Sequence, residues 1–136
     1  MVIIGLSGST DRRRDAVAKA VSESRLARLV TYVLFEPVHG ARLGERRAAR
    51  VRDVLKDVGA ARIEGVVFSQ VRTREEADAL RERGGFMWHV EGCPSCDVPI
   101  QRGDLLVTDK SGGHRHFLDP IEALSETLLQ HAARAA

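Results

Sequence analysis

The sequence has few aromatic residues, few cysteines and no surplus of charge of either sign. Of its 136 residues, 4% are aromatic and 2 are cysteine, while 21 basic residues balance 19 acidic ones to leave a formal charge of +2. This near balance gives no strong sign of a nucleic-acid binder. Two cysteines are also too few for a disulfide scaffold.

Long apolar runs are absent as well. No run approaches the roughly 18 residues that a membrane span needs. Met1 leads into a strand-like segment without a signal-peptide pattern. We therefore expect a cytoplasmic protein without membrane contact. The sequence does not decide whether it forms a homo-oligomer. The length suits a single domain over residues 1–136.

Short apolar runs alternate with longer segments of helical periodicity, a pattern typical of parallel strands joined by crossover helices. We expect strands at 2–6, 30–35, 65–69, 86–90 and 104–108, and helices at about 11–28, 43–58, 74–83 and from 119 onward. Leu26 is expected on the apolar side of the first helix, and Gly84 at the left-handed end of the third. The prediction is a three-layer α/β/α domain with a five-stranded parallel sheet. Ligands bind such domains beyond the carboxyl ends of the strands.

A loop of small residues, Gly5-Leu6-Ser7-Gly8-Ser9-Thr10, lies between the first strand and the first helix. This order points backbone N–H groups and a helix dipole at an anion. The P-loop pattern G-x-x-x-x-G-K-[ST], started at Gly5, requires Gly, Lys and Ser or Thr where the chain has Thr10, Asp11 and Arg12. Because Asp11 would place a negative charge beside a polyphosphate, phosphate transfer by this route is not expected.

Arginines cluster at two places in the expected helices. Arg12, Arg13 and Arg14 fall in the first turn, where their charge meets the positive end of the helix dipole. A bound phosphate would relieve this repulsion; alternatively the three point into solvent or pair with nearby carboxylates, namely Asp11, Asp15 and Glu23. Four further arginines are expected to form a solvated face of the second helix: Arg46, Arg47, Arg50 and Arg52.

The segment from Gly65 to Gly85, GVVFSQVRTREEADALRERGG, resembles the deoxynucleoside monophosphate kinases of tailed phages and their bacterial relatives. Those proteins share the P-loop kinase fold with dephospho-coenzyme A kinases. Their pattern is matched by Arg72, Glu76 and the final Gly84-Gly85. The resemblance extends to Phe35-Glu36-Pro37 and to the closing unit 104–129.

The resemblance implies a P-loop kinase-like fold without the lid and most of the monophosphate-binding region, and suggests a phage or prophage origin. Gln70 stands where the family has Asp, which adds to the P-loop departures. The expected function is that of a degenerate nucleotide kinase that retains at most nucleotide or phosphate binding. Its binding residues would be Ser7, Gly8, Ser9, Thr10, Arg12 and Arg72. The alternatives are a non-catalytic interaction or scaffold protein, and an active (deoxy)nucleoside monophosphate kinase in which Arg replaces the P-loop Lys.

Cys93-Pro94-Ser95-Cys96 offers two thiolates at the spacing of a zinc site. His89 and either His114 or His116 could complete four tetrahedral ligands, with His114 our choice. A redox-active dithiol and two ordinary thiols are the other hypotheses. A nucleotide and zinc are therefore the two candidate bound groups.

Overall fold

Five parallel strands form one sheet in the computed structural model of the chain, which describes residues 1–34 and 40–135. Within these residues the strands are β1 (Val2–Ser7), β2 (Leu29–Tyr32), β3 (Gly65–Phe68), β4 (Phe86–Val90) and β5 (Leu105–Val107). The helices are α1 (Asp11–Ser22), α2 (Leu43–Ala60), α3 (Arg74–Glu82) and α4 (Pro120–Ala135). The predicted α/β class and the five-stranded parallel sheet are confirmed.

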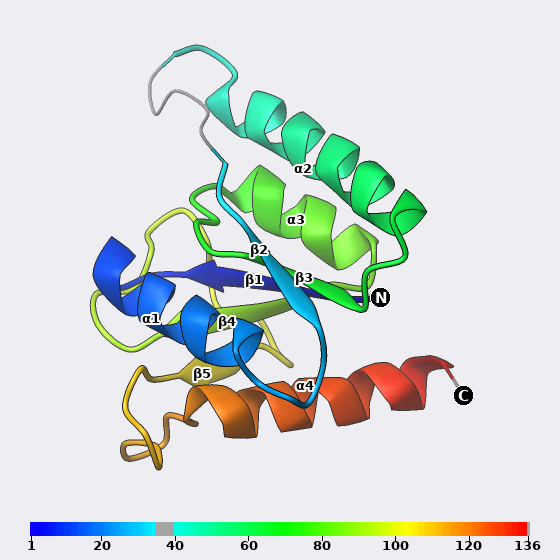
Figure 1. The fold of residues 1–136 in the computed structure, drawn as a ribbon. Helices are drawn as coiled ribbons and strands as arrows, with labels where there is room; N and C mark the ends of the chain where they lie inside the picture. Colours follow the sequence, from blue (N-terminus) through cyan, green and yellow to red (C-terminus); the bar gives the residue numbers. More distant parts are fainter. Residues whose placement is uncertain (35–39, 136) are drawn as a thin grey trace.

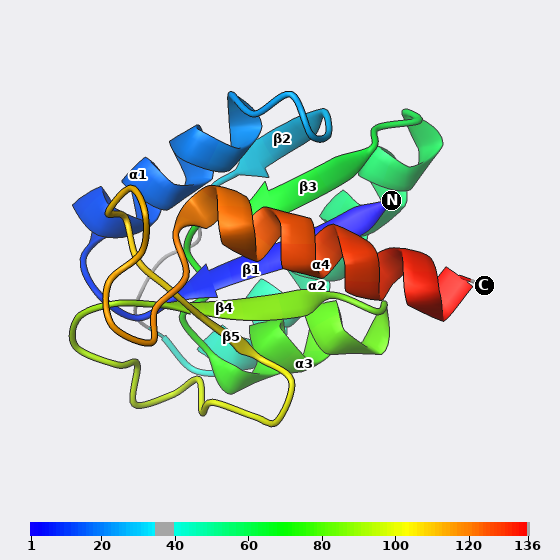
Figure 2. The ribbon, with the colours of Figure 1, turned by 90° about the horizontal axis from the view of Figure 1, so that it is seen from below.

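The strand order is β2-β3-β1-β4-β5, so β1 lies in the middle of the sheet. Ile4 on β1 is in register with Val67 on β3 and with Phe86 on β4. Figures 1 and 2 show α2 and α3 on one face of the sheet and α1 and α4 on the other. Because both faces are covered, the central strands are continuous apolar runs, as is usual for parallel sheets.

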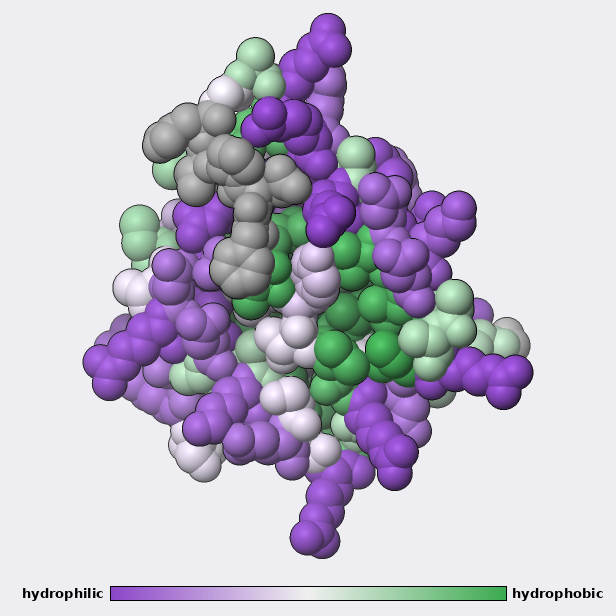
Figure 3. Space-filling model, turned by 45° about the horizontal axis from the view of Figure 1, so that its top comes forward, coloured by the Kyte–Doolittle hydropathy of each residue, from purple (hydrophilic) through white to green (hydrophobic). Residues whose placement is uncertain are grey.

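Each face of the sheet has its own apolar core, since successive side chains of a strand point to opposite faces. Ile4, Leu6 and Trp88 pack toward α1 and α4, and Trp88 Nε1 donates to Thr127 Oγ1 of α4 at 3.0 Å. Phe68 lies in the core under α2 and α3. On the surface in Figure 3, apolar and weakly polar residues gather in the middle and strongly hydrophilic ones line the margin. No helix of the described ranges is long and apolar enough to cross a membrane.

The first helix is shorter than its periodicity predicts. It ends at Ser22 rather than near residue 28, because the chain must turn back for Leu29 to pair with Gly65 of β3. Leu26, expected on the apolar side of the helix, is instead 50% exposed in the turn. The second strand also stops earlier, at Tyr32. The segment Phe35-Glu36-Pro37 lies outside the described residues.

The end of α3 follows the prediction. Gly84 adopts φ +77°, a left-handed conformation that residues with a side chain rarely adopt. The Gly85 amide donates to the Leu80 carbonyl at 2.8 Å, which satisfies one of the last carbonyls of the helix. This tight stop brings the chain directly into β4.

Candidate anion-binding site

The sheet has a topological switch point between β1 and β3. The helix after β1 packs on one face of the sheet, whereas the helix after β3 packs on the other. The loops that leave these two neighbouring strands therefore diverge and open a crevice at their carboxyl ends, which is where open α/β sheets bind ligands.

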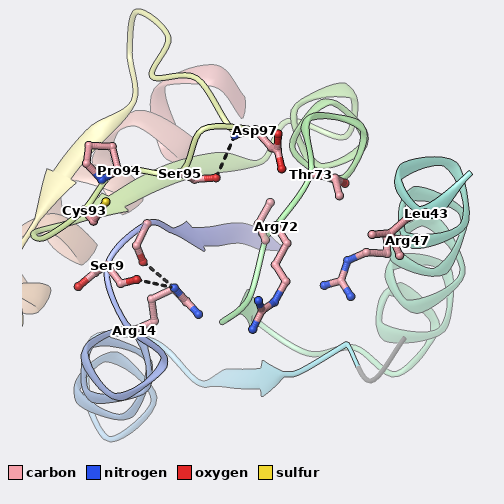
Figure 4. A pocket seen from close by; sticks show the side chains of 12 residues that line it. Ser9, Arg14, Leu43, Arg47, Arg72, Thr73, Cys93, Pro94, Ser95 and Asp97 are labelled. Atoms are coloured by element: carbon pink, nitrogen blue, oxygen red, sulfur yellow. Dashed lines mark hydrogen bonds between the residues drawn. The ribbon is translucent and has the colours of Figure 1, made fainter. Parts of the chain in front are cut away.

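A pocket of about 400 Å³ occupies this crevice. Figure 4 shows the guanidinium groups of Arg14, Arg47 and Arg72 pointing into it from α1, α2 and the loop after β3. We call it the arginine pocket. Its lining residues are Gly8, Ser9, Arg14, Leu43, Arg47, Val71, Arg72, Thr73, Cys93, Pro94, Ser95 and Asp97.

The loop after β1 forms one wall of the arginine pocket. Gly8 and Ser9 have positive φ values of 76° and 60°, and Thr10 then caps α1 by accepting a hydrogen bond from the Arg13 amide at 3.2 Å. The Ser9 amide donates to the Cys93 carbonyl at 2.8 Å. A Cβ on Gly92 would lie 2.6 Å from Ser9 Oγ, so only glycine lets the 92–97 segment pack this closely. A positive φ at a residue other than glycine is often found at a functional site.

Arg14 anchors the loop after β1 through hydrogen bonds to the backbone. It is 8% exposed, and its Nη1 donates to the Gly8 carbonyl at 2.6 Å while its Nε donates to the Ser69 carbonyl at 3.1 Å. Asp11 forms an ion pair with its Nη2. Burial lowers the pKa of the Arg14 guanidinium, and the charge of Asp11 works in the opposite direction. Arg14 thus joins the β1 and β3 loops across the switch point.

Arg47 was predicted to lie on a solvated face of α2. In the structure it instead forms a buried ion pair. It is 1% exposed and pairs with Glu76, which is fully buried. Glu76 also accepts from the Thr73 amide at 3.1 Å and from the Arg72 amide at 3.2 Å. Arg47 Nη2 donates to the Gln70 carbonyl at 3.0 Å. The pair therefore fixes the loop that carries Arg72.

Arg72 is the most accessible cation of the pocket. Its side chain is 38% exposed, and its Nη2 lies 3.3 Å from Asp11 Oδ1 and 3.5 Å from Gln70 Oε1. Both contacts are long for hydrogen bonds of a guanidinium. A ligand could replace them at little cost.

The structure brings together three of the six predicted binding residues, since Gly8, Ser9 and Arg72 line the pocket. Thr10 acts as the helix cap, and Arg12 is exposed on α1 away from the pocket lining. Arg14, rather than Arg12, lines the pocket. Two residues along a helix correspond to a rotation of about 200°, so these side chains leave opposite sides of α1.

Ser7, the sixth residue, belongs to a buried chain of hydrogen bonds. Its Oγ lies 3.0 Å from His89 Nδ1, and His89 Nε2 lies 2.7 Å from Asp104 Oδ2. Burial opposes the charged form of Asp104, but hydrogen bonds from His89 and the Gln101 amide and the charge of Arg81 outweigh it and lower the pKa of Asp104. The ionised Asp104 therefore accepts from His89 Nε2, and the other ring nitrogen, Nδ1, lies within hydrogen-bond distance of the Ser7 hydroxyl.

This Ser7–His89–Asp104 chain has the order of a catalytic triad without access for a substrate. Ser7 is 0% exposed, and four pockets over the described residues do not include it, although His89 lines one of them. A nucleophile must reach its target within about 3 Å. The chain therefore ties β1 and β4 to the segment before β5.

The four predicted zinc ligands do not converge. His89 bonds to Ser7 and Asp104, whereas His114 bonds to Glu91 through Nδ1 at 2.5 Å. Cys93 and Cys96 are both exposed thiols. Over residues 1–34 and 40–135, no cluster of three or more His, Cys, Asp or Glu side chains could hold a metal ion. The predicted zinc site is not found in this part of the chain.

A second charged network lies at the carboxyl end of β4. Glu91 accepts from Arg13 at 2.8 Å and from Thr108 at 3.0 Å, in addition to His114. Arg13 also donates to Asp109 at 2.6 Å. Hydrogen bonds from His114 and Arg13 lower the pKa of Glu91 to about 2. We call these five residues the Glu91 network; it joins α1 to the segment after β5, and the sequence did not predict it.

Neither the protein-family models nor the curated proteins searched contain a match to this chain.

Proposed function

We propose that the protein binds a phosphate group, such as that of a nucleotide, in the arginine pocket and does not transfer it. The observation that carries this proposal is the half-exposed guanidinium of Arg72, which points into a pocket at the switch point beside the Gly8–Ser9 loop. A guanidinium can donate two parallel hydrogen bonds to a phosphate. The resemblance of the 65–85 segment to nucleotide kinases supports the same ligand class.

The surroundings of Arg72 favour an anion further. Arg14 and Arg47 face the same cavity, and Asp97 is the one acidic residue among the described lining residues. The N-terminus of α1 is also close, because the lining residues Gly8 and Ser9 directly precede the cap of that helix. Helix N-termini carry a partial positive charge and favour anions.

Binding without transfer follows from the residues at the catalytic positions of a P-loop. Asp11, in place of lysine, is itself paired with Arg14 and Arg72. Arg12, in place of the hydroxyl that holds magnesium, is exposed away from the pocket lining. The Ser9 amide is bonded to Cys93, so it is not directed at a ligand. The lysine and the magnesium-binding hydroxyl that neutralise the transferred phosphate in a P-loop are therefore replaced at these positions.

Thermal melting tests the proposal directly. The protein is heated with a panel of nucleoside mono- and triphosphates and magnesium, and in parallel the Arg72→Ala and Arg12→Ala variants are heated. A ligand at about 100 times its Kd stabilises the fold by about 2.7 kcal/mol, which raises Tm by several degrees. We expect this rise in the wild type and in Arg12→Ala, and its loss in Arg72→Ala.

Arg12→Ala is the matched control, because it removes the same charge from an exposed position outside the pocket. Equal losses in both variants would indicate a general charge effect. No rise with any nucleotide would overturn the proposal and favour an interaction or scaffold protein. Steady phosphate transfer to a nucleoside monophosphate would instead identify an active kinase.

A further inference from the structure

We infer that Asp11 is a built-in counter-anion of the arginine pocket: its carboxylate holds Arg72, and an entering phosphate must take Arg72 from it. This inference rests on the proposed function and adds which contact of the site a ligand must displace. It depends on Asp11 lying within ion-pair distance of two pocket arginines at once.

The contacts of Asp11 place its carboxylate between the two loops of the pocket. Oδ1 is the shared acceptor of Arg14 Nη2 and of Arg72 Nη2. Arg14 reaches it from the same helical turn, whereas Arg72 reaches it across the crevice from the loop after β3. The carboxylate therefore lies at the N-terminus of α1, the position at which a bound anion would gain most from the helix dipole.

The two ion pairs differ in strength, which determines what a ligand can displace. Arg14 is nearly buried and keeps its bonds to the Gly8 and Ser69 carbonyls, so it stays in place. Arg72 and Asp11 are 38% and 60% exposed, and the distance between them is 3.3 Å. Exposed pairs contribute only about 0.2–1 kcal/mol. The Asp11 contact to Arg72 is therefore the one that gives way.

The charge of the incoming group determines how well it displaces Asp11 from Arg72. A carboxylate or a phosphodiester carries a single negative charge and would merely exchange one monoanion for another on Arg72. A phosphate monoester carries about −1.5 to −2 charges at pH 7 and presents three acceptor oxygens. It can hold Arg72 and also reach other donors of the pocket. The cost of displacing Asp11 is the same for every anion, so Asp11 lowers the affinity of all of them and leaves measurable binding to groups that hold Arg72 strongly, such as a phosphate monoester.

Methyl phosphate and the Asp11→Asn variant test the inference. Binding to the full-length protein is followed by NMR titration of backbone amides and of the Asp11 side-chain carboxyl carbon. We expect Asp11→Asn to bind methyl phosphate about fivefold more tightly, the upper end of the range for an exposed ion pair. In the wild type, saturation should move the Asp11 carboxyl signal toward its position in Arg72→Ala.

Asp15→Asn is the matched control, since Asp15 lies one turn further along α1, is exposed and, unlike Asp11, is not the carboxylate that pairs with Arg14 and Arg72. It removes the same charge, and we expect a change of less than about twofold because solvent screens this carboxylate. Dimethyl phosphate, the monoanionic counterpart, should bind the wild type at least about tenfold more weakly than methyl phosphate.

The outcomes separate this inference from the proposed function. Equal affinity of the wild type and Asp11→Asn, or an Asp11 signal that does not move, would overturn the counter-anion and leave phosphate binding intact. Weaker binding by Asp11→Asn would make Asp11 a contributor to binding, which also overturns the inference. Absence of binding by both proteins would overturn the proposed function itself.

Discussion

Arg13 and Arg14 are neighbours in the first turn of α1, yet they serve two different regions of the molecule. Arg13 turns to the Glu91 network, where Asp109 and Glu91 both bond to it and raise the pKa of its guanidinium. Arg14 turns to the arginine pocket, where backbone carbonyls take most of its donors. The first network is balanced by its own carboxylates, whereas the second shares a single exposed carboxylate between two arginines. We propose the second region for the ligand because the side chain of Arg72 remains partly exposed there.

The largest effect is expected where the pocket depends on a buried charge. Glu76→Gln should lower the free energy of unfolding by about 3–5 kcal/mol, because it leaves the Arg47 guanidinium buried without its counter-ion. Urea unfolding measures this loss. Glu75→Gln is the control, since Glu75 is the exposed neighbour on the same helix. A loss below about 1 kcal/mol would show that water reaches the Arg47–Glu76 pair and that this wall of the pocket is not rigid.

The strands could be predicted from the sequence because each is a short buried run between turn residues. The burial of Arg47 could not be predicted from its own helix, whose neighbouring arginines 46 and 50 are exposed. The signal was in Thr73 and Glu76, whose spacing is that of a capping box, and the structure contains that box. A carboxylate committed to a buried cap requires a cation, and only the packing of α2 on α3 shows which one supplies it.

The side-chain directions of the arginines of α1 could not be predicted from the sequence either. Their position at a helix N-terminus was evident, but the direction of each side chain depends on the rotation of α1 against the sheet. This rotation is set by Val17 and Val21, which lie in the core at 0% exposure. It directs Arg14 into the crevice and Arg12 into solvent. A family pattern aligned on the sequence alone could not distinguish the two.

Acid should remove the stability that the Glu91 network contributes. The folded-state pKa of Glu91 is about 2, below the value of roughly 4.3 expected in an unfolded chain. The stability that this carboxylate contributes is therefore complete above roughly pH 4.3 and is lost as the pH falls toward 2. Acid titration of the free energy of unfolding should show this loss in the wild type and less of it in Glu91→Gln. Glu126→Gln, changed at an exposed position of α4, should follow the wild type.

The smallest expected changes in stability test whether the Glu91 network and the arginine pocket have separate roles. Arg13→Ala should lower the free energy of unfolding by about 1 kcal/mol, because it removes partly exposed ion pairs to Glu91 and Asp109. It should leave the affinity for methyl phosphate unchanged. Arg72→Ala should do the reverse, with an unfolding free energy within about 0.5 kcal/mol of the wild type and no measurable binding. Urea unfolding and NMR titration of both variants measure the two properties. If Arg13→Ala also weakened binding, the Glu91 network would be part of the anion site, and the separation of the Glu91 network from the arginine pocket would be wrong.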